Sequence, residues 1–201
     1  MTDAPPRRVA LFGGTFDPPH LGHMAIAREA IRACDLDRIF FIPCRQSPHK
    51  SDTAAASGPQ RTAMLQIAVG GTPWAEVSTD ELEHGGVSYS YQTAQRFRGR
   101  LPQGGALHWI LGADQWNALH RWSRPDVLAE LLTFIVLPRA GLPLNPRPGF
   151  RSVFLQLTHP ASATKIRQEL WAGHPSPAHL DPAVLAYIRE HGLYLPESPG
   201  S

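Results

Sequence analysis

Residues 12–23 read FGGTFDPPHLGH, and this stretch decides how the chain begins to fold. It follows residues 8–12, RVALF, whose composition is that of a buried strand. The glycine pair Gly13 and Gly14 allows a sharp turn and a close approach of backbone to ligand. Two prolines then precede helix-compatible sequence from His20, because proline is tolerated in the first turn of a helix. The stretch predicts a strand, a tight loop and a helix.

The same alternation of apolar runs and helical patterns continues along the chain. Runs that predict strands occupy residues 8–12, 38–43, 75–79, 107–111, 133–138 and 153–157. Stretches that predict helices occupy residues 20–34, 60–70, 90–99, 125–132, 164–172 and 181–191. Most of the strand runs lack a polar face, as parallel strands covered on both sides do. The pattern predicts the α/β class, with a Rossmann-like, doubly wound parallel sheet and helices on both faces.

Two segments fit neither pattern and are expected to be loops. Residues 45–60 and 139–150 are rich in proline, glycine and small or polar side chains. A loop as long as the first one is usually functional or mobile. No repeat or linker divides the sequence, so residues 1–195 are expected to form a single domain. The tail 196–201, PESPGS, is expected to be disordered.

The composition narrows the class of protein. The 201 residues are 42% hydrophobic and carry a formal charge of only +2, which argues against a nucleic-acid binder. No run approaches the roughly 18 apolar residues of a membrane span. The first eight residues lack the apolar segment of a signal peptide, so a cytoplasmic location is expected. Cys34 and Cys44 are interpreted as reduced thiols, although spacing alone leaves a disulfide open.

The opening stretch has the features of an anion site. Backbone N–H groups of Gly14, Thr15 and Phe16 can face the crevice at the carboxyl end of the first strand, where open α/β sheets bind ligands. Exposed N–H groups beside a helix N-terminus favour phosphate. His20 and His23 lie three residues apart and share one helix face. Two imidazoles there can stabilise the charge that develops as a phosphoanhydride breaks.

Other interpretations of the same residues remain open at this point. The glycines can serve a simple turn, and the histidines can be surface residues. Asp17, His20 and His23 also have the chemistry of three ligands to a divalent metal. The stretch matches neither the dinucleotide fingerprint nor the P-loop.

A second anion site is predicted by residues 162–167, SATKIR. Ser162 or Thr164 is a natural N-cap for the helix that follows. Lys165 and Arg167 fall in its first turn, where cations oppose the helix dipole. A bound anion would resolve this conflict, with hydroxyl, N–H and guanidinium groups converging on phosphate. The plainer alternative is a capping serine beside two solvated cations.

Both stretches resemble the signatures of one superfamily, the nucleotidylyltransferases. GTFDPPHLGH resembles its G-x-F-D-P-x-H-x-G-H motif, and SATKIR its I-S-x-T-x-x-R motif, with Ala161 in place of the leading Ile. Further pieces in order resemble bacterial nicotinate-nucleotide adenylyltransferases over nearly the whole chain. They are SPHK (47–50), QR (60–61), TDELEHGGVSYSYQT (79–93), LGADQW (111–116), RW (121–122), LPR (137–139) and VLAYIREHGLY (184–194).

The resemblance implies transfer of AMP from ATP to nicotinate mononucleotide, with Mg2+ bound to ATP and without a dedicated protein metal site. It implies catalytic roles for His20, His23 and Arg167. It implies an ATP site of Gly13, Gly14, Thr15, Phe16, Gly112, Asp114, Arg139, Ser162, Thr164 and Arg167. It implies a mononucleotide site of Lys50, Thr79, Ser90, Trp116 and Trp122, in which Trp122 stacks on the pyridine ring. Ser123 departs from the tyrosine usual after that tryptophan.

Three alternatives stay open on the sequence. The acceptor can be nicotinamide mononucleotide or another phosphorylated compound, since spacing does not separate acid from amide. A metal-dependent hydrolase would use Asp17, His20 and His23, and would bind metal tightly. A nucleotide-binding module would have lost turnover, which the intact motif residues oppose. The sequence also leaves open whether the chain forms a homo-oligomer.

Overall fold

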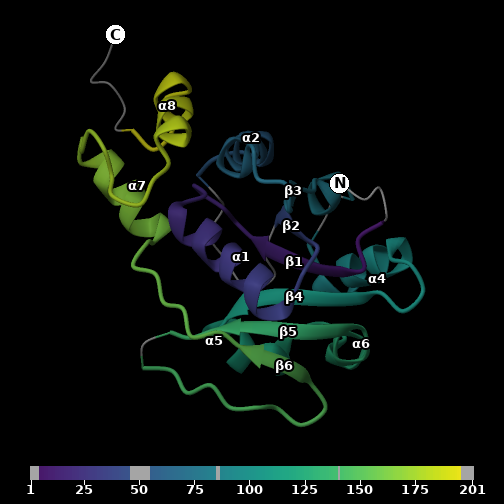
Figure 1. Cartoon of the computed structure of the whole chain (residues 1–201). Helices are drawn as coiled ribbons and strands as arrows, with labels where there is room; N and C mark the ends of the chain where they lie inside the picture. The colour runs from purple at the N-terminus through teal and green to yellow at the C-terminus, as the bar shows by residue number, and fades with distance from the viewer. Residues whose placement is uncertain (1–4, 46–54, 85–86, 140, 196–201) are drawn as a thin grey trace.

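A six-stranded parallel sheet forms the centre of the molecule in the computed structural model, which describes residues 5–45, 55–84, 87–139 and 141–195 (Figure 1). The strand order is β3-β2-β1-β4-β5-β6, and every neighbouring pair is parallel. The bounds are β1 Arg8–Gly14, β2 Arg38–Pro43, β3 Ala75–Val77, β4 Ala106–Gly112, β5 Leu132–Leu137 and β6 Arg151–Phe154. The predicted fold class is confirmed.

The predicted helices are also present, within a few residues of their expected ends. They are α1 Leu21–Cys34, α2 Gly58–Val69, α4 Ser90–Arg100, α6 Pro125–Leu131, α7 Ala163–Trp171 and α8 Pro182–Glu190. Three short elements were not predicted: α3 Asp80–Glu83, α5 Ala113–Asn117 and the 3-10 helix η1 Leu119–Arg121. Each is too short to show a helical period in sequence.

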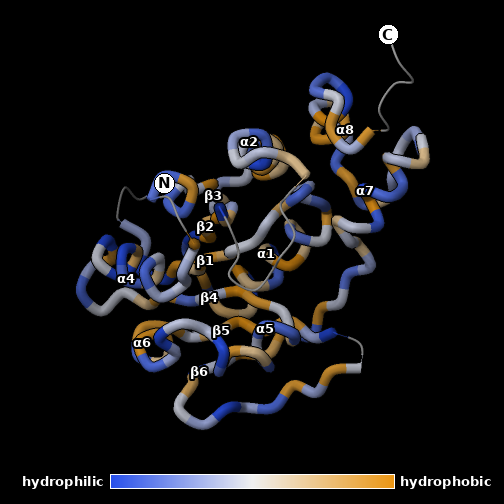
Figure 2. The backbone as a smooth tube through the Cα atoms, turned by 180° about the vertical axis from the view of Figure 1, so that it is seen from behind, coloured by the Kyte–Doolittle hydropathy of each residue, from blue (hydrophilic) through white to orange (hydrophobic). Residues whose placement is uncertain are grey.

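The two faces of the sheet are covered by different helices. Ala10 and Phe12 of β1 pack into one core with side chains of α1 and α2. Val9 and Leu11, which alternate with them, pack into a second core with side chains of α4, α5 and α6. A third apolar cluster joins α2 to α7 and α8, beside the sheet. The central strands β1, β4 and β5 are apolar and mostly buried, and Figure 2 shows the hydrophobic residues gathered along the sheet.

One predicted strand differs in detail from the structure. The last strand is predicted at residues 153–157, whereas β6 spans Arg151–Phe154. Just after this strand, the N–H of Leu155 donates a hydrogen bond to the Val136 carbonyl at 2.9 Å. The expected tail, 196–201, lies outside the described residues. Cys34 and Cys44 are both reduced thiols. None of the helices in the described ranges is long and apolar enough to cross a bilayer.

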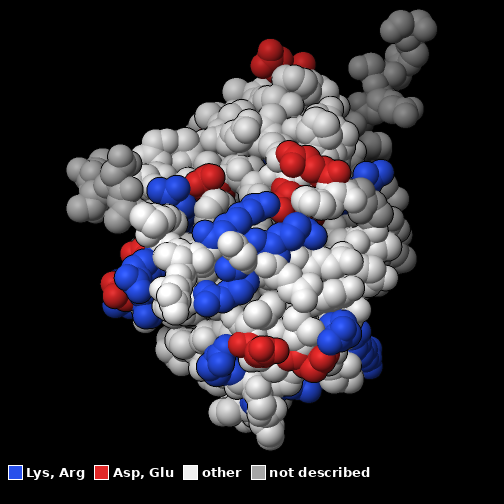
Figure 3. All heavy atoms as spheres, turned by 90° about the vertical axis from the view of Figure 1, so that its right-hand side faces the viewer, with Lys and Arg blue, Asp and Glu red and all other residues white. Residues whose placement is uncertain are grey.

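Acidic and basic side chains are interspersed on the face shown in Figure 3. The buried Asp80 carboxylate forms salt bridges with Arg96 at 2.5 Å and with Arg100 at 3.0 Å. Arg98 on the same helix donates to the Gly105 carbonyl at 2.6 Å. These arginines therefore pair within the protein, in keeping with the small net charge.

Candidate functional site

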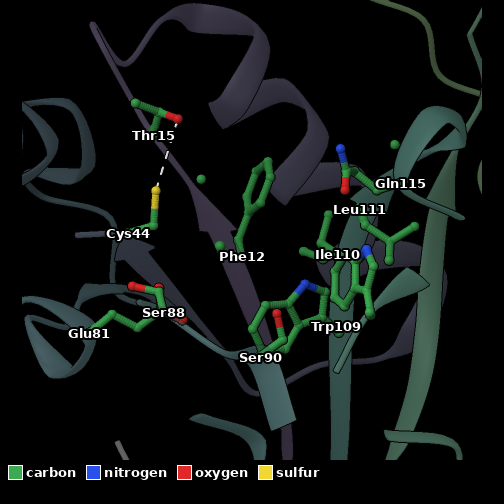
Figure 4. Close-up of a pocket in the computed structure, with 14 residues that line it drawn as sticks. Phe12, Thr15, Cys44, Glu81, Ser88, Ser90, Trp109, Ile110, Leu111 and Gln115 are labelled. Atoms are coloured by element: carbon green, nitrogen blue, oxygen red, sulfur yellow. Dashed lines mark hydrogen bonds between the residues drawn. The ribbon is translucent and has the colours of Figure 1, made fainter. Parts of the chain in front are cut away.

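A cavity of about 200 Å³ opens at the carboxyl ends of β1 and β4 (Figure 4). The strand order reverses direction between these two strands, the point at which open α/β sheets bind ligands. The cavity is lined by Phe12, Gly13, Gly14, Thr15, Cys44, Glu81, Ser88, Ser90, Trp109, Ile110, Leu111, Gly112, Gln115 and Trp122.

Aromatic packing explains the glycine pair at the end of β1. A Cβ on Gly13 would lie 3.0 Å from Cζ2 of Trp109, and one on Gly14 would lie 3.1 Å from the ring of Phe16. Phe16 itself is buried in the left-handed conformation, with φ of 51°. The loop is thus wound tightly over two rings, and a side chain at either glycine would require a ring to shift.

The two motif histidines lie face to face at the start of α1. Their rings stack with centroids 3.7 Å apart. The backbone N–H of His20 donates to Nδ1 of His23 at 3.1 Å. An imidazole that accepts at Nδ1 carries its proton on Nε2, so the far nitrogen of His23 is a donor.

His20 is a neutral imidazole at pH 7. Its pKa is lowered from 6.5 to about 4, mainly because burial disfavours the charged ring, with smaller effects of His159 and His179 nearby. A Cβ on Gly22 would lie 3.0 Å from Nδ1 of both His20 and His159, so a larger residue would require these rings to shift. The pair can thus donate hydrogen bonds from N–H groups without a permanent charge.

The second motif meets the first in space. Arg167, on α7, donates from its guanidinium to the carbonyl oxygen of Asp17 at 2.6 Å, across 150 residues of sequence. Ser162 is the N-cap of α7, and Thr164 in its first turn is exposed. No acidic residue occupies that turn. The arrangement places one guanidinium and the N-terminus of α7 beside the His20 loop.

The carboxylate of Asp17 is already used inside the protein. It accepts from the N–H groups of Ala55 at 2.8 Å and Ala56 at 3.1 Å, and from the hydroxyl of Tyr194 at 2.5 Å. Within the described ranges, no group of three His, Cys, Asp or Glu side chains can hold a metal ion. The interpretation of Asp17, His20 and His23 as three metal ligands is therefore not supported.

The residues expected on the adenosine side lie around the end of β4. Gly112 lines the cavity and is the N-cap of α5, with open space where a Cβ would be. Asp114, in the first turn of α5, forms an exposed ion pair with Arg139. The acid and the arginine thus meet at the surface, next to the cavity lining.

The residues expected around the mononucleotide have four different outcomes. Ser90 and Trp122 line the cavity, where Trp122 packs edge-on against Trp109 with centroids 6.2 Å apart. Trp116 is a correction: it is fully buried, packs against core phenylalanines and donates to the Asn145 carbonyl at 3.0 Å, away from the lining. Thr79 bonds Glu83 and lines a different hollow. Lys50 lies outside the described residues.

Sequence reasoning missed Glu81, the one carboxyl group among the described residues that line the cavity. Glu81 is 6% exposed, and the Thr93 hydroxyl donates to it at 2.9 Å. Burial raises its pKa, and hydrogen bonds from Thr93 and Ser88 oppose that effect. In the sequence, Glu81 follows shortly after the strand predicted at residues 75–79. Its neighbours are polar, so the sequence did not indicate that this side chain would be buried against the cavity.

Comparisons with known proteins agree with this geometry. Residues 11–169 match the cytidylyltransferase-like family. A relative from Oceanobacillus iheyensis, named "Probable nicotinate-nucleotide adenylyltransferase", is 39% identical over 94% of this chain and 97% of its own. A relative of the same name from Solibacter usitatus is 39% identical over 93% of this chain and 99% of its own.

Solved structures give the same picture of the fold. Plasmodium falciparum nicotinic acid mononucleotide adenylyltransferase complexed with NaAD aligns with a TM-score of 0.74 at 18% identity, over 94% of this chain and 97% of that one. The same enzyme complexed with APC aligns with a TM-score of 0.70 at 17% identity, over 94% and 97%.

Proposed function

The chain belongs to the nicotinate-nucleotide adenylyltransferases of the cytidylyltransferase-like family, and we propose that it transfers the AMP part of ATP to nicotinate mononucleotide. The products are deamido-NAD and pyrophosphate, a step in NAD biosynthesis. The observation that carries the proposal is that the loop after β1 presents the stacked pair His20 and His23 and is itself bonded, at the Asp17 carbonyl, by Arg167 of the second motif. The cavity that contains Trp122 adjoins the same strand end.

The reaction needs no protein nucleophile and no protein base. The 5′-phosphate of the mononucleotide is already ionised at neutral pH, and its oxygen forms the new bond to the α-phosphorus of ATP. The bond between the α-phosphorus and the bridging oxygen breaks, and pyrophosphate leaves with that electron pair. Catalysis is then positioning and stabilisation of charge on the phosphoryl oxygens.

Each part of the site has a role in this scheme. Backbone N–H groups of Gly14, Thr15 and Phe16, with the N-terminus of α1, hold phosphate oxygens. His20 and His23 donate hydrogen bonds to the charge that develops on the triphosphate, and Arg167 adds a cation there. Trp122 offers a flat apolar face for the pyridine ring of the acceptor.

The ATP substrate is MgATP. Mg2+ prefers oxygen ligands and keeps several waters, so phosphate oxygens and water can hold it without a protein cage. This fits a loop whose own carboxylate, Asp17, is already bonded to Ala55, Ala56 and Tyr194. We also place the enzyme in the cytoplasm, where ATP is available and thiols such as Cys34 and Cys44 stay reduced.

The test measures pyrophosphate release from MgATP with nicotinate mononucleotide, with nicotinamide mononucleotide and without an acceptor. We expect rapid release with the acid, much slower release with the amide and none without an acceptor. A preference for the amide would keep the chemistry and change the acceptor. Phosphate release without an acceptor would replace the proposal with a hydrolase.

A further inference from the structure

Asp17 joins three segments that are far apart in sequence. Its carboxylate is 4% exposed and accepts from two backbone N–H groups, those of Ala55 and Ala56 just before α2. Its third donor is the hydroxyl of Tyr194, 177 residues away and just beyond α8. The carboxylate therefore connects the His20 loop both to the start of α2 and to the C-terminal helix.

The backbone of the same loop is held by two arginines. The guanidinium of Arg61, which is 2% exposed, donates to the Thr15 carbonyl at 2.8 Å and to the Ala56 carbonyl at 3.2 Å. Arg167 donates to the Asp17 carbonyl at 2.6 Å. The segment that ends three residues before His20 is thus bonded from several directions.

Tyr194 is held in this network by its hydroxyl and by the packing of its ring. Its backbone adopts the left-handed conformation, with φ of 58°. Its ring packs with the apolar cluster that Met64, Ile166 and Ile188 help to form between α2, α7 and α8. Burial, with the contact to Asp17 next, raises the pKa of the phenol, so it stays a proton donor throughout the physiological range.

We infer that Tyr194 is a positioning residue of the triphosphate site, which it serves by holding Asp17 and through it the loop that presents Thr15, Phe16 and His20. The inference rests on the proposed function for the identity of the ligand. Tyr194 lines no part of the cavity of Figure 4, so it acts through Asp17 and not by contact with the acceptor. A hydrogen bond from a hydroxyl to a carboxyl group is of the stronger kind, and its loss frees the side chain on which the loop depends.

The test is Tyr194→Phe, which removes the hydroxyl and keeps the ring in its apolar cluster. We expect the KM for ATP to rise roughly tenfold and kcat to fall by a similar factor, because the phosphate donors are less well placed. The KM for the mononucleotide should stay within about twofold of the wild type. Amide hydrogen exchange at Ala55 and Ala56 should become faster, since both amides bond to Asp17.

The matched control is Tyr187→Phe. Tyr187 lies on α8 and stacks on His191 with centroids 3.9 Å apart, so it packs on the same apolar cluster as Tyr194 without the Asp17 contact. We expect wild-type kinetics and wild-type exchange at Ala55 and Ala56. A double-mutant cycle with Asp17→Asn should be strongly non-additive in the KM for ATP, because both changes weaken one contact: Tyr194→Phe removes its donor, and Asp17→Asn replaces its charged acceptor with a neutral amide.

Other outcomes separate this inference from the proposed function. Equal changes in both KM values, an unchanged KM for ATP, or additive effects with Asp17→Asn would show a merely structural tyrosine and overturn the inference. If the wild type releases no pyrophosphate with nicotinate mononucleotide, the proposed function fails. In that case, the affinity for MgATP measured by calorimetry and the amide hydrogen exchange at Ala55 and Ala56 still test the positioning role of Tyr194.

Discussion

Burial determines the chemistry of individual side chains in this site. His20 is held neutral, with a pKa of about 4, because the folded chain removes its ring from water and places two further histidines nearby. Glu81 undergoes the opposite change, since burial raises the pKa of a carboxyl group. The two tryptophans of the same segment differ for the same reason: Trp122 lines the cavity, while Trp116 is fully enclosed. Residue type alone therefore does not assign a role.

The first prediction concerns the stability of the ligand-free protein at acid pH. The unfolded chain binds a proton on His20 below about pH 6.5, and the folded chain binds it only near pH 4. The free energy of unfolding should therefore fall as pH decreases through this window, with about 2 kcal/mol lost to His20 by pH 5. Urea unfolding at pH 7 and pH 5 measures the loss.

His20→Gln is the control for this titration, because glutamine keeps a polar amide and does not ionise. The variant should lose less stability than the wild type between pH 7 and pH 5. An identical loss in both proteins would contradict the assignment of the effect to His20.

A second prediction separates the two tryptophans. Trp122→Ala should raise the KM for the mononucleotide roughly tenfold, through loss of a stacking face, and leave the KM for ATP nearly unchanged. Trp116→Phe should leave both KM values unchanged and lower the free energy of unfolding by about 1–3 kcal/mol, since it leaves a void and removes the bond to Asn145. Steady-state kinetics and urea unfolding distinguish the outcomes. A mononucleotide KM that changes with Trp116 instead would restore that residue to the site.

At the scale of elements, the end of β1 and the start of α1 are defined by contacts with neighbours. The glycine pair was expected to make room for phosphates. The structure adds a second reason, because the rings of Trp109 on β4 and Phe16 on the loop occupy the space where side chains would be. The strand end is therefore shaped by packing as well as by its ligand.

The element-scale prediction is a difference between two glycines. Gly13→Ala should lower the free energy of unfolding by about 1–3 kcal/mol, because its Cβ would lie 3.0 Å from Trp109. Gly99→Ala on α4 has open space around the new Cβ and should raise it by about 0.5–1 kcal/mol, because alanine favours the helix. Urea unfolding measures both. Equal effects of the two changes would contradict the packing argument.

At the scale of the molecule, the parallel sheet brings residues from opposite ends of the chain together. Every strand of a parallel sheet ends at the same edge, and the loop after β1 lies there beside the segment that leads to α7. Asp17 then collects donors from residues 55, 56 and 194, which spread across most of the sequence. The proposed triphosphate site is consequently a property of the whole fold.

The whole-molecule prediction concerns removal of divalent metal. EDTA should abolish pyrophosphate release, and excess Mg2+ should restore it, because the metal enters with ATP. The thermal unfolding midpoint of the ligand-free protein should not change, since the described part of the chain has no group of three ligating side chains for a metal. A midpoint that falls with EDTA would reveal a structural metal and contradict this account.

The sequence by itself determined the parallel α/β architecture and the two phosphate motifs. Uninterrupted apolar runs and helical periods are local patterns, and the strands and helices of the structure lie close to the ranges that these patterns predict. The short elements α3, α5 and η1 were missed because one helical turn leaves no period to detect. The sequence also predicted that His20 and His23 lie side by side, because residues three positions apart share one face of a helix.

Only the tertiary structure decided which side chains face the cavity and which hold the site from behind. Trp116 and Trp122 lie six residues apart in similar polar surroundings, and burial separated them. The bonds from Tyr194 and Arg167 to Asp17 join residues 177 and 150 positions apart, beyond the reach of any local pattern. The physical reason is that hydrogen bonding and desolvation depend on neighbours in space, whereas sequence periodicity reports only neighbours along the chain.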